Sequence, residues 1–176
     1  MYKMRKIMAI IVLTALIFSS FSCAPEEEGG FFRRLDSPAC FKVSGQRHGV
    51  AFSAEIEISE GEGRMVFRSP ASLAGITVTT AGGVYNCALD GIAVEGIPAE
   101  LLGAPISVFV SVGEARSAEK LKDAEGGALT LIVTATENGS VEYYIDSKSG
   151  FPVSVTEKDL AGETVMQLDI TEYTIK

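Results

Sequence analysis

The feature that most constrains the fold is a two-residue alternation of apolar side chains with polar or small ones. It is clearest between residues 50 and 58, where every second residue is apolar: Val50, Phe52, Ala54, Ile56 and Ile58. Successive side chains of a β-strand point to opposite faces of a sheet, so this pattern predicts a long, half-buried strand. The fold must therefore contain a sheet with one apolar face.

The same pattern recurs along the chain between turns rich in glycine. A hairpin turn at Gly61-Glu62-Gly63 is expected to lead into a strand over 64–69. Further strands are predicted at 76–80, 84–89, 92–94, 128–136, 141–145, 153–158 and 164–173. Asn138-Gly139 is the strongest hairpin signal among the turns. The pattern predicts about nine or more antiparallel strands.

The middle of the chain has a different pattern. Pro98 can occupy the first turn of a helix, and the apolar residues after it follow steps of three and four. The spacing predicts a helix over 98–112, although its β-branched residues are mediocre helix formers. The polar stretch 113–127 is expected to be a loop. Together these elements predict a single α+β domain that is mostly antiparallel β.

The N-terminus carries the three parts of a secretory signal. Lys3, Arg5 and Lys6 precede an apolar run of 12 residues, Ile7 to Phe18, and small residues follow that run. A helix needs about 20 apolar residues to cross a bilayer, so the run is short for a permanent span. We expect residues 1–22 to be a signal peptide.

Ser22-Cys23 resembles a bacterial lipobox, in which the cysteine receives a diacylglycerol group and becomes the new N-terminus. Ser20 and Phe21 depart from that pattern. Ordinary cleavage after Ser22 is the alternative. Residues 23–39 begin as an acidic, glycine-containing stretch that suits a flexible tether. We expect lipidation of Cys23 and anchoring on the extracytoplasmic face of a cell membrane.

Removing residues 1–22 changes the charge balance. Three of the 15 Lys and Arg residues lie in the signal and none of the 23 Asp and Glu residues does, so 12 positive charges remain against 23 negative ones, a net charge of −11. This balance argues against nucleic acid as a partner. It equally argues against adhesion to anionic headgroups by charge alone. Residues 40–176 are expected to form the one domain.

Two cysteines remain besides Cys23. Cys40 and Cys87 are separated by 47 positions in a chain that is expected to be exported, where a disulfide is permitted. The alternative is a pair of buried free thiols. The sequence leaves both open.

Signatures of catalysis and metal binding are missing from the sequence. There is one histidine, His48, and no CxxC, HExxH, GxSxG or phosphate-binding glycine loop. His48 with Cys40 and Cys87 is too small a set for a structural zinc site. We therefore expect neither an enzyme nor a resident cofactor or metal.

Several features in their order resemble the LolA/LolB-like lipoprotein-carrier superfamily. They are the strand 50–58 with its partner 65–67, the Phe67-Arg68-Ser69-Pro70 step with Leu73 to Ile76, the Ile97-Pro98 pair, the turn from Asp146 to Pro152, and the final strand through Asp169 to Tyr173. The resemblance implies a curved, unclosed β-barrel-like sheet covered by helix, with a space for acyl chains. It implies no catalytic residue.

On this resemblance, the candidate residues lining a ligand cavity are Phe52, Ile56, Met65, Phe67 and Phe109. The alternative is that these side chains fill a solid core. The expected function is that of a membrane-anchored lipoprotein that binds or carries a lipid or other apolar ligand. The alternative function is a non-catalytic sensor or protein-interaction module of the envelope, with its cavity packed.

Overall fold

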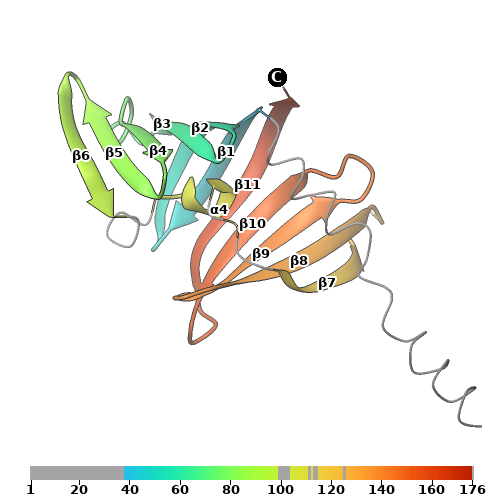
Figure 1. Ribbon diagram of the computed structural model, residues 1–176. Coiled ribbons are helices and arrows are strands. Elements are labelled where there is room, and N and C mark those ends of the chain that lie inside the picture. The colour runs from blue at the N-terminus through green and yellow to red at the C-terminus, as the bar shows by residue number, and fades with distance from the viewer. Residues whose placement is uncertain (1–37, 99–103, 111, 113–114, 125, 176) are drawn as a thin grey trace, which may run out of the picture.

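The computed structural model describes residues 38–98, 104–110, 112, 115–124 and 126–175. Within them the chain forms one antiparallel sheet of 11 strands, in the order β6-β5-β4-β3-β2-β1-β11-β10-β9-β8-β7. The sheet is strongly curved and its two end strands, β6 and β7, do not pair with each other (Figure 1). The prediction of a mostly antiparallel, unclosed, curved sheet is confirmed.

Nine of the 11 strands fall on segments that were predicted to be strands, whereas β1 and β7 fall where none was predicted. Their bounds are β1 Ala39–Arg47, β2 Val50–Ser59, β3 Glu62–Ser69, β4 Thr77–Ala81, β5 Val84–Leu89, β6 Ile92–Pro98, β7 Ala115–Lys122, β8 Ala128–Thr136, β9 Gly139–Asp146, β10 Pro152–Asp159 and β11 Thr164–Ile175. The predicted ranges 84–89 and 128–136 are those of β5 and β8. The sheet has an N-terminal half, β1 to β6, and a C-terminal half, β7 to β11. The two halves are joined where β1 pairs with β11.

Most strands send alternate side chains to an inner, concave face. β2 shows this best, because Phe52, Ala54, Ile56 and Ile58 are buried and the residues between them are not. Buried residues from β1, β3, β8, β9, β10 and β11 extend the same face into a single hydrophobic core. The period-two pattern is therefore the local cause of the core.

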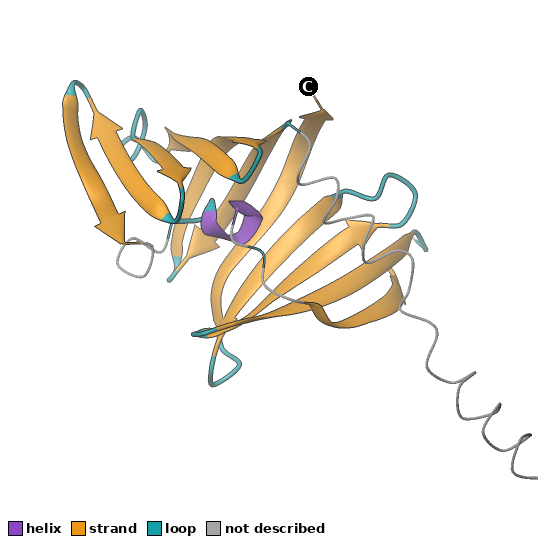
Figure 2. Cartoon of the chain, viewed as in Figure 1, coloured by secondary structure: helices purple, strands orange, loops and turns teal. Residues whose placement is uncertain are grey.

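One short helix, α4 (Ser107–Val110), lies against the inner face where the two halves meet (Figure 2). The ring of Phe109 stacks on that of Phe41 in β1 with 5.2 Å between centroids. On the other side, the hydroxyl of Tyr143 in β9 donates a hydrogen bond of 2.6 Å to the carbonyl oxygen of Val108. A Cβ atom at Gly63 in β3 would lie 2.6 Å from Cδ1 of Ile106, so glycine lets the segment approach the sheet.

The prediction of a helix over 98–112 is wrong in extent. Pro98 ends β6 and does not begin a helix, and the described helix covers only four residues. Pro105 lies inside the predicted range, and proline lacks the backbone N–H that a helix interior needs, so the helix begins only after it. Residues 99–103, 111 and 113–114 lie outside the described part of the chain.

The predicted loop over 113–127 is also wrong in part, because Ala115–Lys122 forms β7. β7 lies at the edge of the sheet, and β8 is its one partner among the described strands. Its charged side chains, including Arg116, Glu119 and Lys120, face water, which gives the strand the composition of a loop. No described helix has the length and apolar composition needed to cross a membrane.

Candidate functional site

The inner face is not filled throughout. Beside α4, over β2 to β5, lies an apolar pocket of about 480 Å³. Its lining residues are Arg47, His48, Val50, Phe52, Phe67, Leu73, Ile76, Val78, Cys87, Ala104 and Pro105. All of them except Arg47 and His48 have apolar or weakly polar side chains. Ligand pockets in proteins typically measure about 300–1,000 Å³, so this space can take a small apolar molecule or an acyl chain.

The base of the pocket is made by residues that the strand pattern places inward. Phe52 in β2 and Val78 in β4 are buried. The Phe52 ring meets Phe67 of β3 edge to face, with centroids 5.6 Å apart and an interplanar angle of 72°. Such aromatic pairs are held in one geometry by their quadrupoles, so this side of the pocket is preformed.

A second part of the lining comes from the turn between β3 and β4. Two hydrogen bonds to Pro70 O, from the amides of Leu73 and Ala74, fold the turn. Two more, Gly75 N to Phe67 O and Phe67 N to Ile76 O, both 3.0 Å, fasten it to β3. Leu73 and Ile76 are thereby held over the inner face as half-buried side chains.

Cys87 lies at the end of the pocket near the sheet edge. Burial raises the pKa of its thiol, because the charged thiolate would lose solvation. The thiol is therefore held in its neutral, weakly nucleophilic form, which fits an apolar lining residue.

Cys40 and Cys87 are both free, so the disulfide that the sequence allowed is not formed. Cys40 is in β1 and Cys87 in β5, with β2, β3 and β4 between them. Adjacent strands lie about 4.8 Å apart, whereas a disulfide needs Cα atoms within about 7 Å. In addition, the side chain of Cys87 lies on the inner face of the sheet and that of Cys40 on the outer face.

Two of the five predicted cavity residues, Phe52 and Phe67, line the pocket. The other three, Ile56, Met65 and Phe109, lie in the hydrophobic core and are almost completely buried. Leu73, Ile76, Val78 and Cys87 also line the pocket but were not among the predicted cavity residues. The proline break at Ser69-Pro70 was the available signal for Leu73 and Ile76, since it forces the chain to turn back over the sheet.

The cationic end of the pocket is Arg47, the last residue of β1. Its Nη1 donates to Oε2 of Glu157 in β10 at 2.7 Å, and the same nitrogen lies 3.7 Å from Sδ of Met166. Both charged side chains are only about a quarter exposed, at 23% and 24%. An ion pair thus stands at the border between the pocket and the packed core.

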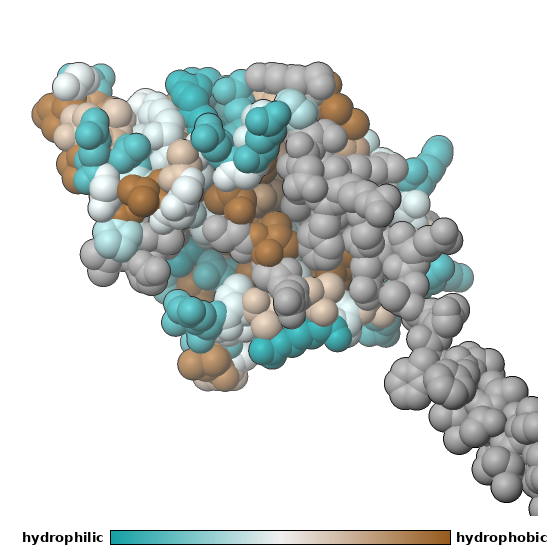
Figure 3. All heavy atoms as spheres, viewed as in Figure 1, coloured by the Kyte–Doolittle hydropathy of each residue, from teal (hydrophilic) through white to brown (hydrophobic). Residues whose placement is uncertain are grey.

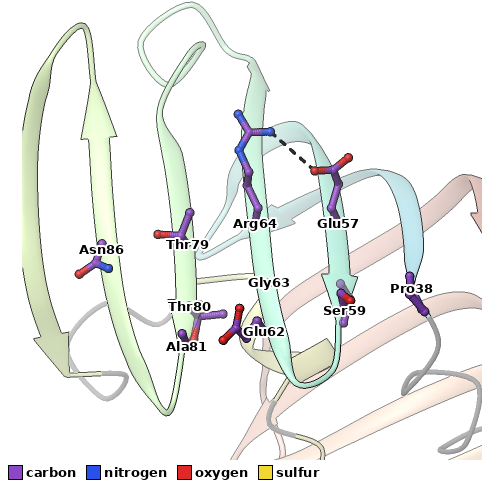
Figure 4. Close-up of a pocket in the computed structure, with 11 residues that line it drawn as sticks. Pro38, Glu57, Ser59, Glu62, Gly63, Arg64, Thr79, Thr80, Ala81 and Asn86 are labelled. Atoms are coloured by element: carbon purple, nitrogen blue, oxygen red, sulfur yellow. Dashed lines mark ion pairs between the residues drawn. The ribbon is translucent and has the colours of Figure 1, made fainter. Parts of the chain in front are cut away.

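A second pocket, of about 490 Å³, is lined by a mixture of polar and apolar residues (Figure 4). Four of its residues form a row across neighbouring strands: Glu57, Arg64, Thr79 and Asn86. Arg64 Nη1 and Glu57 Oε2 are 3.9 Å apart, and Asn86 Oδ1 accepts a hydrogen bond from Gly96 N. The row alternates with the buried side chains, so it belongs to the outer face, where exposed polar residues are usual.

Cys23 and the predicted signal and tether lie outside the described residues, apart from Pro38 and Ala39, the latter being the first residue of β1. Across the described ranges, no group of three His, Cys, Asp or Glu side chains is arranged to hold a metal ion.

The sequence matches no protein-family model and no curated protein. Solved structures do match. An uncharacterized conserved protein from Thermus thermophilus has a TM-score of 0.61 at 17% identity, over 87% of each chain. A domain named for outer membrane lipoprotein sorting, from Vibrio parahaemolyticus, has a TM-score of 0.50 at 10% identity, over 86% of this chain and 91% of that one.

A LolA superfamily protein from Nitrosomonas europaea also matches, at 9% identity over 84% of this chain and 93% of that one, with a TM-score of 0.45 that carries no weight alone. At such identities a likeness concerns the fold and not the ligand. The expected resemblance is confirmed at the level of the fold, which the chain shares with the Thermus thermophilus protein and with the Vibrio parahaemolyticus domain.

Proposed function

We propose that this chain is a non-catalytic lipoprotein of the cell envelope that holds the acyl chain of a lipid, or a similar apolar ligand, in the pocket beside α4. The single observation that carries the proposal is the apolar pocket of about 480 Å³ on the concave face. Burial of apolar area stabilises such a complex by about 25 cal/mol per Å². Binding then needs no specific polar motif, which agrees with the lack of one in the sequence.

The proposed anchor is a diacylglycerol group on Cys23. Its support is the signal-like N-terminus and the Ser22-Cys23 pair. Mass spectrometry of the N-terminus of protein taken from native membranes tests it, with a Cys23→Ala chain as control. A mature N-terminus at an unmodified Cys23 would contradict the anchor but not the pocket.

Two neighbouring residues of β5 test the pocket itself. Cys87 lines the pocket, whereas the side chain of Ala88 is exposed on the outer face of the sheet. Cys87→Phe should fill the pocket, and Ala88→Phe should add the same ring outside it. Native mass spectrometry of the full chain should show co-purified lipid in the wild type and in Ala88→Phe, and little in Cys87→Phe. Equal lipid in both variants, or none in any, would overturn the proposal.

A second function, that of a protein-interaction module, is favoured by the edge strand β6. Ile92 is 74% exposed and Val94 is 55% exposed. Edge strands with unpaired backbone groups readily accept another strand. Cross-linking from position 94 in whole cells tests this: a specific envelope protein captured there, together with an empty pocket, would favour the second function over the first.

A further inference from the structure

The apolar pocket has one polar end. Of its 11 lining residues, Arg47 alone carries a full positive charge, and His48 beside it is the one other ionisable nitrogen base. His48 is exposed at the turn that follows β1, and Val50, which pairs with Arg47 across that turn, is also exposed. The end defined by Arg47, His48 and Val50 therefore faces water, while Phe52 and Val78 lie deeper.

Arg47 has hydrogen-bonding capacity that the described part of the protein does not use. A guanidinium group has five N–H donors spread over Nε, Nη1 and Nη2. The described contacts of Arg47, to Glu157 and to Met166, are all made through Nη1. A second acceptor can therefore bind Nη2 or Nε while Glu157 still orients the group.

Stability alone is a poor explanation for this ion pair. Arg47, Met166 and Glu157 are aligned across β1, β11 and β10, and Met166 is fully buried. Removing two charges from water at such a position costs free energy that the pair only partly recovers. An arginine held this way by a carboxylate is, however, a suitable partner for the planar or tetrahedral oxygens of an anion.

We propose, on the basis of the function proposed above, that the ligand is an amphiphile with an anionic headgroup, a carboxylate or a phosphate, bound at Arg47. Its apolar chain lies along Phe52, Phe67 and Val78 toward Cys87. Without residues 1–22 the chain has a net charge of −11, which repels anions in general. The positive charge of Arg47 at the one polar end of the apolar pocket therefore attracts an anionic headgroup locally, although the protein as a whole is negative.

The test uses four probes with the same twelve-carbon chain and a terminal diazirine: a carboxylate, a phosphate, a neutral glycerol ester and a trimethylammonium. The full chain is reconstituted in phosphatidylcholine nanodiscs, irradiated with each probe below saturation, and digested for mass spectrometry. We expect the peptide that contains Cys87 to be labelled about tenfold more by the two anionic probes than by the neutral one, and least by the cation. Comparing the carboxylate with the phosphate separates the two headgroup sources. Inorganic phosphate should compete only weakly.

Three variants assign the preference to Arg47. Arg47→Gln should bring the anionic-to-neutral ratio close to one. Glu157→Gln should raise it, because the guanidinium is then released to the ligand. Arg68→Gln is the matched control: it removes an exposed arginine that is paired with Glu55, and it should leave the ratio unchanged.

The outcomes separate the two proposals. A ratio near one in the wild-type protein, with the pocket still labelled, overturns the anionic headgroup and leaves the apolar carrier intact. No labelling of the pocket by any probe overturns the carrier itself. A ratio that Arg47→Gln leaves high, or that Glu157→Gln fails to raise, removes Arg47 from headgroup recognition. Because each ratio is internal to one variant, a moderate loss of stability does not change it.

Discussion

The two halves of the sheet carry the same alternating pattern but differ in what covers their inner faces. In the C-terminal half, a row across the strands runs through Ile132, Tyr143, Val155 and Leu168, and all four are buried. In the N-terminal half, the corresponding row runs from Met65 through Val78 and Cys87 to Val94, and it ends exposed. The same pattern therefore makes a solid core in one half and a pocket wall in the other.

The surface agrees with this contrast. In Figure 3 hydrophobic residues gather at the end of the molecule where Figure 1 places β5 and β6. The exposed apolar residues there are Val84, Leu89, Ile92 and Val94. The opposite edge, β7, carries charged side chains in their place. One edge of the sheet is thus protected against pairing and the other is open to contact.

The turns of the two halves also differ. In the N-terminal half, His48-Gly49, Glu60-Gly61, Gly82-Gly83 and Asp90-Gly91 have positive φ at both residues, as two-residue hairpin turns require. In the C-terminal half, aspartates accept backbone N–H groups: Asp123 from Gly127, Asp146 from Ser149, and Asp159 from Ala161 and Glu163. The first set depends on backbone conformation at two consecutive residues, whereas the second combines side-chain oxygens with one positive-φ glycine in each turn, Gly126, Gly150 or Gly162.

The largest expected effect separates the solid core from the open face. Leu168→Ala should lower the free energy of unfolding by about 2–5 kcal/mol, because a fully buried side chain leaves a cavity. Val94→Ala, at the exposed end of the other row, should cost less than about 0.5 kcal/mol. Urea denaturation of the full chain measures both. Similar losses at the two positions would show that the N-terminal face is covered as tightly as the C-terminal one.

The next effect concerns the seat of α4 between the halves. A Cβ atom at Gly63 would lie 2.6 Å from Ile106 Cδ1 and 2.9 Å from Val110 Cγ1, so Gly63→Ala must displace the helical segment. We expect a loss of about 1–3 kcal/mol in thermal or urea unfolding. Arg64→Ala, the next residue and on the outer face, is the control and should cost little. If Gly63→Ala left the free energy of unfolding unchanged, α4 would be only loosely held against the sheet.

A smaller effect is expected where α4 is tied to the C-terminal half. Tyr143→Phe removes the hydrogen bond to Val108 O and should cost about 1 kcal/mol. Tyr144→Phe is the matched control, because the Tyr144 hydroxyl makes only a 3.2 Å bond to Glu142 at the outer side. Denaturation of the two variants side by side checks this. A larger loss for Tyr144→Phe would contradict the assigned anchor.

The smallest effect tests the aspartate turns. The hydrogen bonds from Ser149 hold the pKa of Asp146 below its usual value, so its ionised form stabilises the fold above the unfolded-state pKa near 3.8. That contribution is lost as the pH falls through the lowered folded-state pKa. Asp146→Asn should reduce the loss of stability on the acid side by less than about 0.5 kcal/mol, because the carboxyl group is only partly shielded from solvent. Thermal melts from pH 2 to 7 would detect it, and a steeper acid side would contradict it.

Much of the fold was predictable because strand patterns are local. Alternation at Val50 to Ile58 and the glycine turns were enough to place most strands and to identify the inner face. β7 has the composition of a loop because it is an edge strand with one neighbour, and its charged residues hide the alternation. The helix was overextended because apolar steps of three and four also occur in a segment that is buried for other reasons, as Ile106 and Phe109 are.

For the candidate site, the alternating pattern is enough to predict an apolar face and to place Phe52 and Phe67 on it. The folded structure is needed to see that Ile56, Met65 and Phe109 are packed, whereas Phe52 and Phe67 border a space. It also decided that Arg47 meets Glu157, 110 positions away, at the end of that space. The physical reason is that the direction of a side chain follows from the local backbone. Whether other parts of the chain cover that side chain depends on the curvature of the sheet and on the positions of α4 and the turn after Pro70. Those features are set by strands that are far apart in the sequence.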